Sequence, residues 1–256
     1  LNSLMGTLDI SGSNVNYSFP GDVEISRSLA GDDCDGGYNI SKEDFSTEGV
    51  ETGLARFNTN KGRFTIEVIG EEDRDDEGEM VFEGYNSPDG SMLACVIASD
   101  RNPRGQRVDP GGRKSKRIDS AGRELNFAVR LPSTTPSLDA KTYRIFSYGT
   151  SLATDGGVTF SGHDAGTMSS AGEAVSFNGM SENFTTRVAD QNTISSGSRI
   201  SALEGSSGTV SLGASSEISF EAAGIKFKGY VHEDAKSIIF YGATDTSIGL
   251  YIGILQ

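Results

Sequence analysis

The chain repeats part of its own sequence. Phe-Glu-Gly-Tyr at residues 82–85 returns as Phe-Lys-Gly-Tyr at 227–230, an interval of 145 residues. At the same interval the apolar run at 92–96 falls on 237–241, and Asp100 falls on Asp245. Upstream, residues 62–66 match 208–212 at an interval of 146. A match at a nearly fixed period predicts that a structural unit has been duplicated.

Apolar residues alternate with other residues along most of the chain, as at Phe64, Ile66 and Val68. This period of two is typical of half-buried strands. Turn-forming clusters at 88–90, 170–172 and 206–208 separate the alternating runs, and we assign the 33 glycines chiefly to such turns. The sequence therefore predicts an all-β protein, with one short helix at 41–45 where Ser41 has the position of a capping residue.

A segment rich in proline, serine and threonine at 132–137 separates the two copies. Proline removes a backbone donor, so we interpret this segment as an exposed linker. The predicted organisation is two tandem related domains, 1–131 and 138–256. Each has room for about eight short strands, which favours a meander β-barrel or a β-sandwich. A β-propeller to which each copy contributes several blades is the alternative.

The first copy carries an insertion at 101–117 that the second lacks. It holds seven of the chain's 22 basic residues. Long loops without internal structure are usually functional or mobile, and we expect this one to be a mobile, exposed docking segment. Its nearest acidic counterpart is the run at 71–79, which we expect to form a solvated hairpin end.

The composition bears on partners and cellular setting. A net charge of −14 argues against nucleic acid as the main partner, because phosphates would be repelled. Nothing approaches the roughly 20 consecutive apolar residues of a membrane-spanning helix. Cys34 and Cys95 permit one disulfide, which their surroundings neither require nor exclude. The start at Leu1 fits either a removed signal sequence or none.

Candidate chemistry is sparse. The only histidines, His163 and His232, belong to no recognisable nucleophilic set, and we expect both to lie in exposed loops. The acidic, glycine-containing stretch at 32–39 offers Asp32, Asp33 and Asp35 as a candidate calcium site, although it lacks the spacing of an EF-hand loop. Apart from calcium, we expect no cofactor. The absence of tryptophan disfavours sugar-stacking enzymes and lectins.

Four short motifs carry a resemblance. Thr-Tyr-Arg-Ile-Phe at 142–146, Val-Thr-Phe-Ser-Gly at 158–162, Phe-Lys-Gly-Tyr-Val at 227–231 and the terminal run at 249–254 resemble tandem glycine-rich β-repeat units of bacterial secreted proteins and lipoproteins. The resemblance implies a secreted, periplasmic or cell-surface location but no activity.

The missing catalytic sets, together with the repeat and the acidic composition, lead us to expect a non-enzymatic structural or interaction module. Its partners would be other domains of the same surface protein or another protein. A small-ligand-binding barrel is the alternative, and a carbohydrate-active enzyme is less favoured. Inward-facing Phe, Ile and Val would indicate a filled core, whereas inward Gly, Ser and Ala would indicate a cavity.

Overall fold

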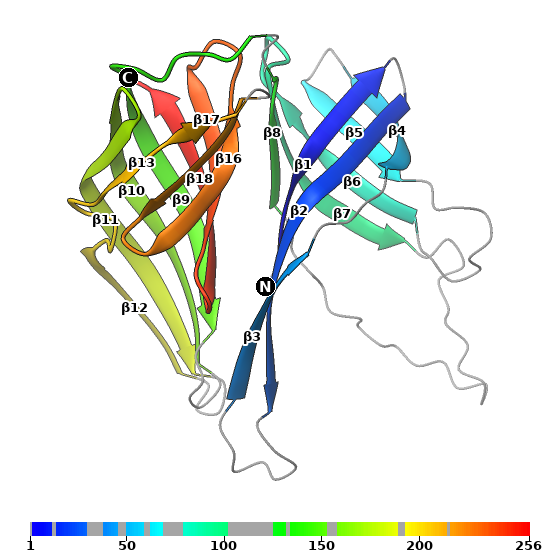
Figure 1. Ribbon diagram of the computed structural model, residues 1–256. Helices are drawn as coiled ribbons and strands as arrows, with labels where there is room; N and C mark the ends of the chain where they lie inside the picture. Colours follow the sequence, from blue (N-terminus) through cyan, green and yellow to red (C-terminus); the bar gives the residue numbers. More distant parts are fainter. Residues whose placement is uncertain are drawn as a thin grey trace, which may run out of the picture. The chain divides into compact units, whose positions relative to one another are not determined.

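The chain is all-β in the computed structural model, with no helix among the residues that it describes (Figure 1). The described residues are 2–11, 14–29, 38–45, 50–58, 62–68, 79–101, 125–131, 134–152, 158–188, 193–213 and 216–256. The strands form two antiparallel sheets, and the chain divides into two compact units. Within this described part, no helix has the length and hydropathy needed to cross a membrane.

The first sheet runs in the order β1-β2-β4-β5-β6-β7-β8, and β3 also pairs with β2. Its strands are β1 (Asn2–Ser11), β2 (Asn14–Leu29), β3 (Tyr38–Phe45), β4 (Val50–Asn58), β5 (Arg63–Val68), β6 (Glu79–Asn86), β7 (Met92–Arg101) and β8 (Leu125–Val129). The helix expected at 41–45 is wrong, because this segment lies in β3 and Ser41 pairs with Ser26 of β2. Pairing with a neighbouring strand overrides a weak local capping signal.

The second sheet has ten strands. They are β9 (Thr142–Leu152), β10 (Val158–Ala171), β11 (Ala174–Val188), β12 (Thr193–Ile200), β13 (Ser207–Thr209), β14 (Ser211–Leu212), β15 (Glu217–Ala222), β16 (Ile225–Val231), β17 (Ser237–Ala243) and β18 (Ser247–Leu255). Their order is β12-β11-β10-β9-β18-β17-β16-β15-β14. The path is open, so the described strands form no closed barrel by a continuous ladder.

One short segment connects two distant parts of this path. β13 pairs with β11, so that Val175 faces Gly208, and β14 pairs with β15, so that Ile218 faces Leu212. A Cβ on Gly208 would lie 2.3 Å from the backbone oxygen of Glu221, so only glycine lets β13 pass this close to β15. The turns expected at 170–172 and 206–208 are both partly strand, because β10 extends to Ala171 and β13 begins at Ser207. The turn at 88–90 is present, and Gly90 and Gly172 have positive φ.

The interval of 145 residues is kept in the strand register. Gly84 of β6 faces Cys95 of β7, and Gly229 of β16 faces Phe240 of β17. The order β5-β6-β7-β8 also matches β15-β16-β17-β18. The match at 146 is wrong as a guide to topology, because β15, and not the segment 208–212, pairs with β16 as β5 pairs with β6. Duplication of whole domains, and their limits at 131 and 138, stay predictions.

The core of the second sheet is filled by large side chains. Five aromatic rings form its centre: Phe177, Phe220, Phe227, Phe240 and Tyr251. The rings of Phe220 and Phe227 stack with centroids 4.7 Å apart, and those of Phe240 and Tyr251 stack at 5.2 Å. Such contacts add to the hydrophobic stabilisation of burial. At this depth the sheet contains a packed core rather than a cavity.

Candidate functional site

A row of glycines crosses the core-facing side of the second sheet. Gly242 of β17 faces Gly249 of β18, Gly249 faces Gly149 of β9, and Gly149 faces Gly162 of β10. Four neighbouring strands therefore carry no side chain at this level. Glycine inside a strand weakens the strand and often marks a close approach by a ligand or another backbone.

A row of polar side chains lies two residues further along these strands, between the glycines and the aromatic core. Ser147 of β9 faces Tyr251 of β18 and hydrogen-bonds to Asp164 of β10. Asp164 faces Glu182 of β11, which in turn faces Arg199 of β12. Strand pairing thus brings together residues from five strands that are far apart in the sequence.

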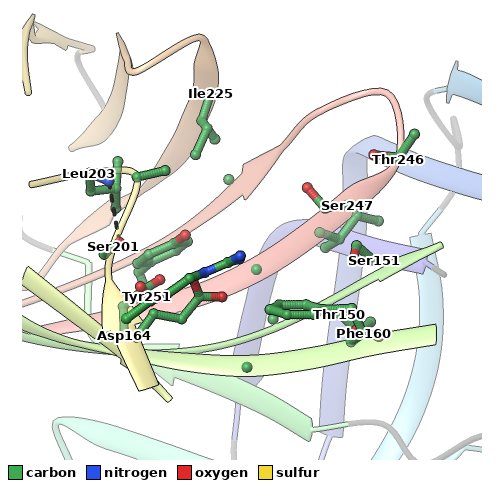
Figure 2. A pocket seen from close by; sticks show the side chains of 18 residues that line it. Thr150, Ser151, Phe160, Asp164, Ser201, Leu203, Ile225, Thr246, Ser247 and Tyr251 are labelled. Atoms are coloured by element: carbon green, nitrogen blue, oxygen red, sulfur yellow. Dashed lines mark hydrogen bonds and ion pairs between the residues drawn. The ribbon is translucent and has the colours of Figure 1, made fainter. Parts of the chain in front are cut away.

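Residues of these two rows line a pocket of about 390 Å³ (Figure 2). Its lining combines the glycine row, the acidic and aromatic side chains of the polar row, and small hydroxyl residues. The hydroxyl side chains are those of Thr150, Ser151, Ser201, Thr246 and Ser247. We call this the glycine-floored pocket. Its size is within the range of small-molecule sites in proteins.

Asp164 lines the pocket and has few hydrogen-bond partners. Its Oδ2 accepts a hydrogen bond from Ser147 Oγ at 3.0 Å, and the same Oγ accepts one from the Asp164 backbone N–H at 2.8 Å. Its Oδ1 is buried and has no hydrogen-bond partner that meets the geometric criteria among the described residues. The Tyr251 hydroxyl is nonetheless close enough to this carboxylate for a side-chain hydrogen bond to contribute to the raised pKa of Tyr251. A buried carboxylate oxygen without a partner carries a free-energy cost.

The negative charge of Asp164 also affects the pKa of the neighbouring Tyr251, whose side chain is only 7% exposed. Burial raises the pKa of the Tyr251 hydroxyl, and the carboxylates of Asp164 and Glu182 raise that pKa further. Tyr251 is therefore a neutral phenol at physiological pH.

Glu182 already has a cationic partner. Arg199 Nε donates to Glu182 Oε2 at 2.6 Å. The guanidinium also lies over two stacked rings, 5.0 Å from the centroid of Phe160 and 5.1 Å from that of Phe184. Because this ion pair compensates the charge of Glu182, the uncompensated charge in the pocket is that of Asp164.

The sequence-predicted metal residues Asp32, Asp33 and Asp35 lie outside the described residues, as do Cys34, the acidic run at 71–78 and the basic segment at 102–117. Within the described part, no group of three or more His, Cys, Asp or Glu residues is placed to hold a metal ion. The calcium site stays a prediction.

The expectation that both histidines lie in exposed loops is wrong for each. His163 is exposed but lies within β10, where its Nε2 is 3.3 Å from Asn183 Nδ2. His232 lies in the β16–β17 turn, as its sequence neighbours suggest, but it is only 4% exposed. Residue type alone does not reveal that the ring turns inward.

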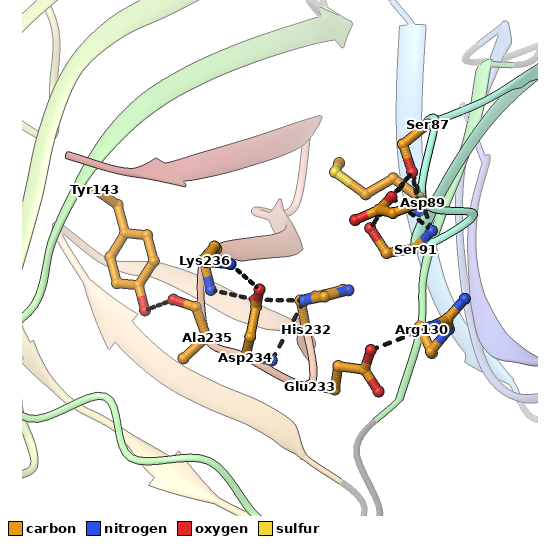
Figure 3. A network of polar contacts seen from close by, with 11 residues as sticks. Ser87, Asp89, Ser91, Arg130, Tyr143, His232, Glu233, Asp234, Ala235 and Lys236 are labelled. Atoms are coloured by element: carbon orange, nitrogen blue, oxygen red, sulfur yellow. Dashed lines mark hydrogen bonds and ion pairs between the residues drawn. The ribbon is translucent and has the colours of Figure 1, made fainter.

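His232 is part of a structured turn (Figure 3). Its Nδ1 lies 2.5 Å from Asp234 Oδ1, and Lys236 Nζ lies 2.8 Å from Asp234 Oδ2. Burial acts to raise the pKa of Asp234, but hydrogen bonds from Lys236 and His232 outweigh it and hold that pKa well below its usual range. The Tyr143 hydroxyl donates to the Ala235 backbone oxygen at 2.8 Å and anchors the turn to β9.

Sequence reasoning missed the pocket because it assigned glycines to turns. A signal was present: Gly149, Gly162, Gly242 and Gly249 each lie within a run that has the composition of a strand rather than in a turn-forming cluster. Their alignment across four strands depends on the register. No protein-family model matches the chain, and no curated protein sequence matches it.

Proposed function

We propose that this chain is a non-enzymatic binding module and that its second sheet binds a small hydroxylated amine in the glycine-floored pocket. One observation carries the proposal: the Asp164 carboxylate lines a pocket together with a row of glycines and several hydroxyl side chains. An ammonium group in the pocket would be attracted by the negative charge of this carboxylate.

The floor supports a ligand that lies against the backbone. The three described atoms nearest to a Cβ on Gly149 would be backbone atoms at 3.3 Å and beyond, whereas a Cβ on any of the other three glycines of the row would meet a side chain at 3.0 Å or less. Open space against the backbone is therefore found at Gly149. The inward-facing aromatic residues indicate a filled core, whereas the inward-facing glycines and serines indicate a cavity. Both occur in this sheet, at different levels along the strands.

The charge of the site favours a cation. Asp164 and Glu182 carry two negative charges and Arg199 carries one positive charge, so the three together are negative by one. The surrounding serine and threonine hydroxyls suit a ligand that also has hydroxyl groups. An amino sugar in its ammonium form combines these properties with a ring whose C–H face can lie against a backbone floor.

The histidine chemistry supports a non-enzymatic role. The Nε2 of His232 is buried and has no hydrogen-bond partner, so no serine or cysteine of the described residues is placed to donate a proton to it. Among the described residues, the Asp234–His232 pair therefore has no third member of the kind that a nucleophilic site requires. It serves instead to order the β16–β17 turn.

For the architecture, we infer that β13 and β14 complete a barrel-like wall between β11 and β15, and that the shared hairpin register reflects duplication of a domain. The resemblance to bacterial repeat units and the acidic composition support a place in a secreted, periplasmic or cell-surface protein. The proposals on architecture and location do not depend on the ligand proposal.

The ligand proposal is tested by NMR titration of the ¹⁵N-labelled chain with D-glucosamine and, separately, with D-glucose. The two sugars differ in an ammonium group that replaces a hydroxyl. Glucosamine should shift the amide signals of the four pocket glycines, which are Gly149, Gly162, Gly242 and Gly249. Glucose at the same concentration should shift these signals less. Asp164→Asn should abolish the preference for glucosamine, because it removes the charge and keeps the shape.

Steric controls come from two serines on strands. Ser151→Phe should block the pocket and abolish the shifts. Ser219→Phe should not, because Ser219 is exposed on β15 and does not line the pocket. If neither sugar shifts the four glycine signals, or if Ser151→Phe leaves the shifts unchanged, the proposal is wrong.

A further inference from the structure

The outer edge of β12 is unpaired in the described part of the structure. β12 pairs with β11 on one side over eight residues, and no strand of the described part pairs with it on the other. Proteins usually protect such edges with lysine, proline, bulges or very short strands. β12 contains neither lysine nor proline, and its ladder with β11 is regular from end to end.

The side chains of β12 are also unusual for a solvent-facing edge. Ile194 is 66% exposed and Ile200 is 75% exposed. Both lie on the outer face of the sheet, because the intervening odd-numbered residues Gly197 and Arg199 face Phe184 and Glu182 on the inner side. Two large apolar side chains at opposite ends of one exposed strand face require a partner to be buried.

The sequence of β12 is nearly symmetric about Gly197. It is Ile-Ser-Ser-Gly-Ser-Arg-Ile from 194 to 200. In an antiparallel pairing of two copies centred on Gly197, Ile194 faces Ile200 of the other copy and Ser196 faces Ser198. Cross-strand apolar pairs of this kind stabilise sheets. Any register displaced by two residues would place each isoleucine opposite a smaller residue or beyond the strand.

We propose that two copies of this chain associate through β12, paired antiparallel with Gly197 at the centre, so that the two second sheets become one continuous sheet. A twofold interface uses the same surface on both copies, and the symmetry of residues 194–200 meets that requirement. Addition of a strand to an exposed edge is a general mode of recognition.

Electrostatics permit this contact although the chain has a net charge of −14. The only charged residue of β12 is Arg199, which is compensated by Glu182 of its own chain. In the proposed register Arg199 faces Ser195 of the other copy, so no like charges meet. The long-range repulsion between two acidic copies remains, and added salt should screen it and strengthen the dimer.

The first measurement is sedimentation velocity of the full chain over a range of protein and salt concentrations. We expect a dimer that dissociates on dilution, because a single strand edge buries a small area. Ile194→Lys should abolish it by adding an edge-protecting charge. Thr185→Lys is the matched control, since Thr185 is exposed on β11, one strand away from the edge. Circular dichroism of each variant verifies that it remains folded.

The register is tested by disulfide cross-linking. In a background with Cys34→Ser and Cys95→Ser, Ser196→Cys and Ser198→Cys chains are prepared separately and then mixed under oxidising conditions. The mixture should form a heterodimeric disulfide, with far less product from either chain alone. A chain that is monomeric at every concentration overturns the proposal. So does equal cross-linking of either single variant with itself.

Discussion

Glycine has a packing role in this protein that its usual association with turns conceals. Gly229 lies within β16 opposite Phe240, and a Cβ there would be 2.0 Å from the Ile239 backbone oxygen and 2.5 Å from the Phe240 Cβ. Gly84 has the same surroundings in β6, with 2.2 Å to the Ala94 oxygen and 2.6 Å to the Cys95 Cβ. Neither residue has a positive φ. Their lack of a side chain, rather than their backbone freedom, is what the fold uses.

This role predicts the effect of adding one methyl group. Gly229→Ala should destabilise the protein by about 1–3 kcal/mol, because the new Cβ overlaps backbone atoms that cannot move independently. Gly84→Ala should have an effect of similar size. Gly213→Ala is the control, since its Cβ would make ordinary contacts at 3.5 Å and beyond, and its effect should be within about 0.5 kcal/mol. Urea unfolding measures all three, and equal stabilities would contradict the packing role.

At the scale of elements, the sequence predicted hairpins better than it predicted their assembly. The match of 82–85 with 227–230 identified two hairpins whose registers agree, because short-range pairing depends on residues close in sequence. The second match, of 62–66 with 208–212, did not predict strand pairing, because these segments are similar in pattern but pair with strands that do not correspond. Alternation is common to all strands, so it cannot determine which strand lies next to which.

The β15–β16 hairpin offers a test of local turn chemistry. Ala223 and Gly224 connect the two strands, and both have positive φ, 54° and 75°. Two such residues in succession form a type I′ turn, for which Asn-Gly is preferred. Ala223→Asn should therefore stabilise the protein by about 0.5–1 kcal/mol, because asparagine tolerates the left-handed region better than alanine.

Ala202 provides the control for this substitution. It is exposed in a turn and has no positive φ, so Ala202→Asn should give no stabilisation. Thermal unfolding of both variants, monitored by circular dichroism, separates a conformational effect from a general benefit of asparagine. Destabilisation by Ala223→Asn would contradict the assignment of the turn.

At the scale of the whole molecule, the pocket shows what a single sequence leaves undetermined. Each of its glycines is visible in the sequence, but the row exists only because β17, β18, β9 and β10 align them. Asp164 is equally inconspicuous among 36 acidic residues. It becomes distinctive when strand pairing places it beside Tyr251 and Glu182 and buries one of its oxygens. Long-range register is the information that alternation and composition do not contain.

Buried tyrosines give the molecule a common sensitivity to alkaline pH. Burial, assisted by the Glu217 carboxylate, raises the pKa of Tyr230 to about 12. Burial also raises the pKa values of Tyr143 and Tyr251, and nearby carboxylates add to the effect. In the unfolded chain a tyrosine ionises near pH 10. The folded state therefore retains protons that the unfolded state releases, and stability falls as pH rises above about 10.

For Tyr230 the loss should begin near the unfolded pKa of about 10 and be complete once the pH passes about 12, with a slope of about 1.4 kcal/mol per pH unit for this one group. Tyr230→Phe should flatten the pH dependence of the unfolding free energy in this window by that amount. Tyr148→Phe is the matched control, because the Tyr148 side chain is 58% exposed. Urea unfolding of the three proteins across this window is the measurement. An unchanged slope in Tyr230→Phe would mean that the Tyr230 hydroxyl is not held neutral by the fold.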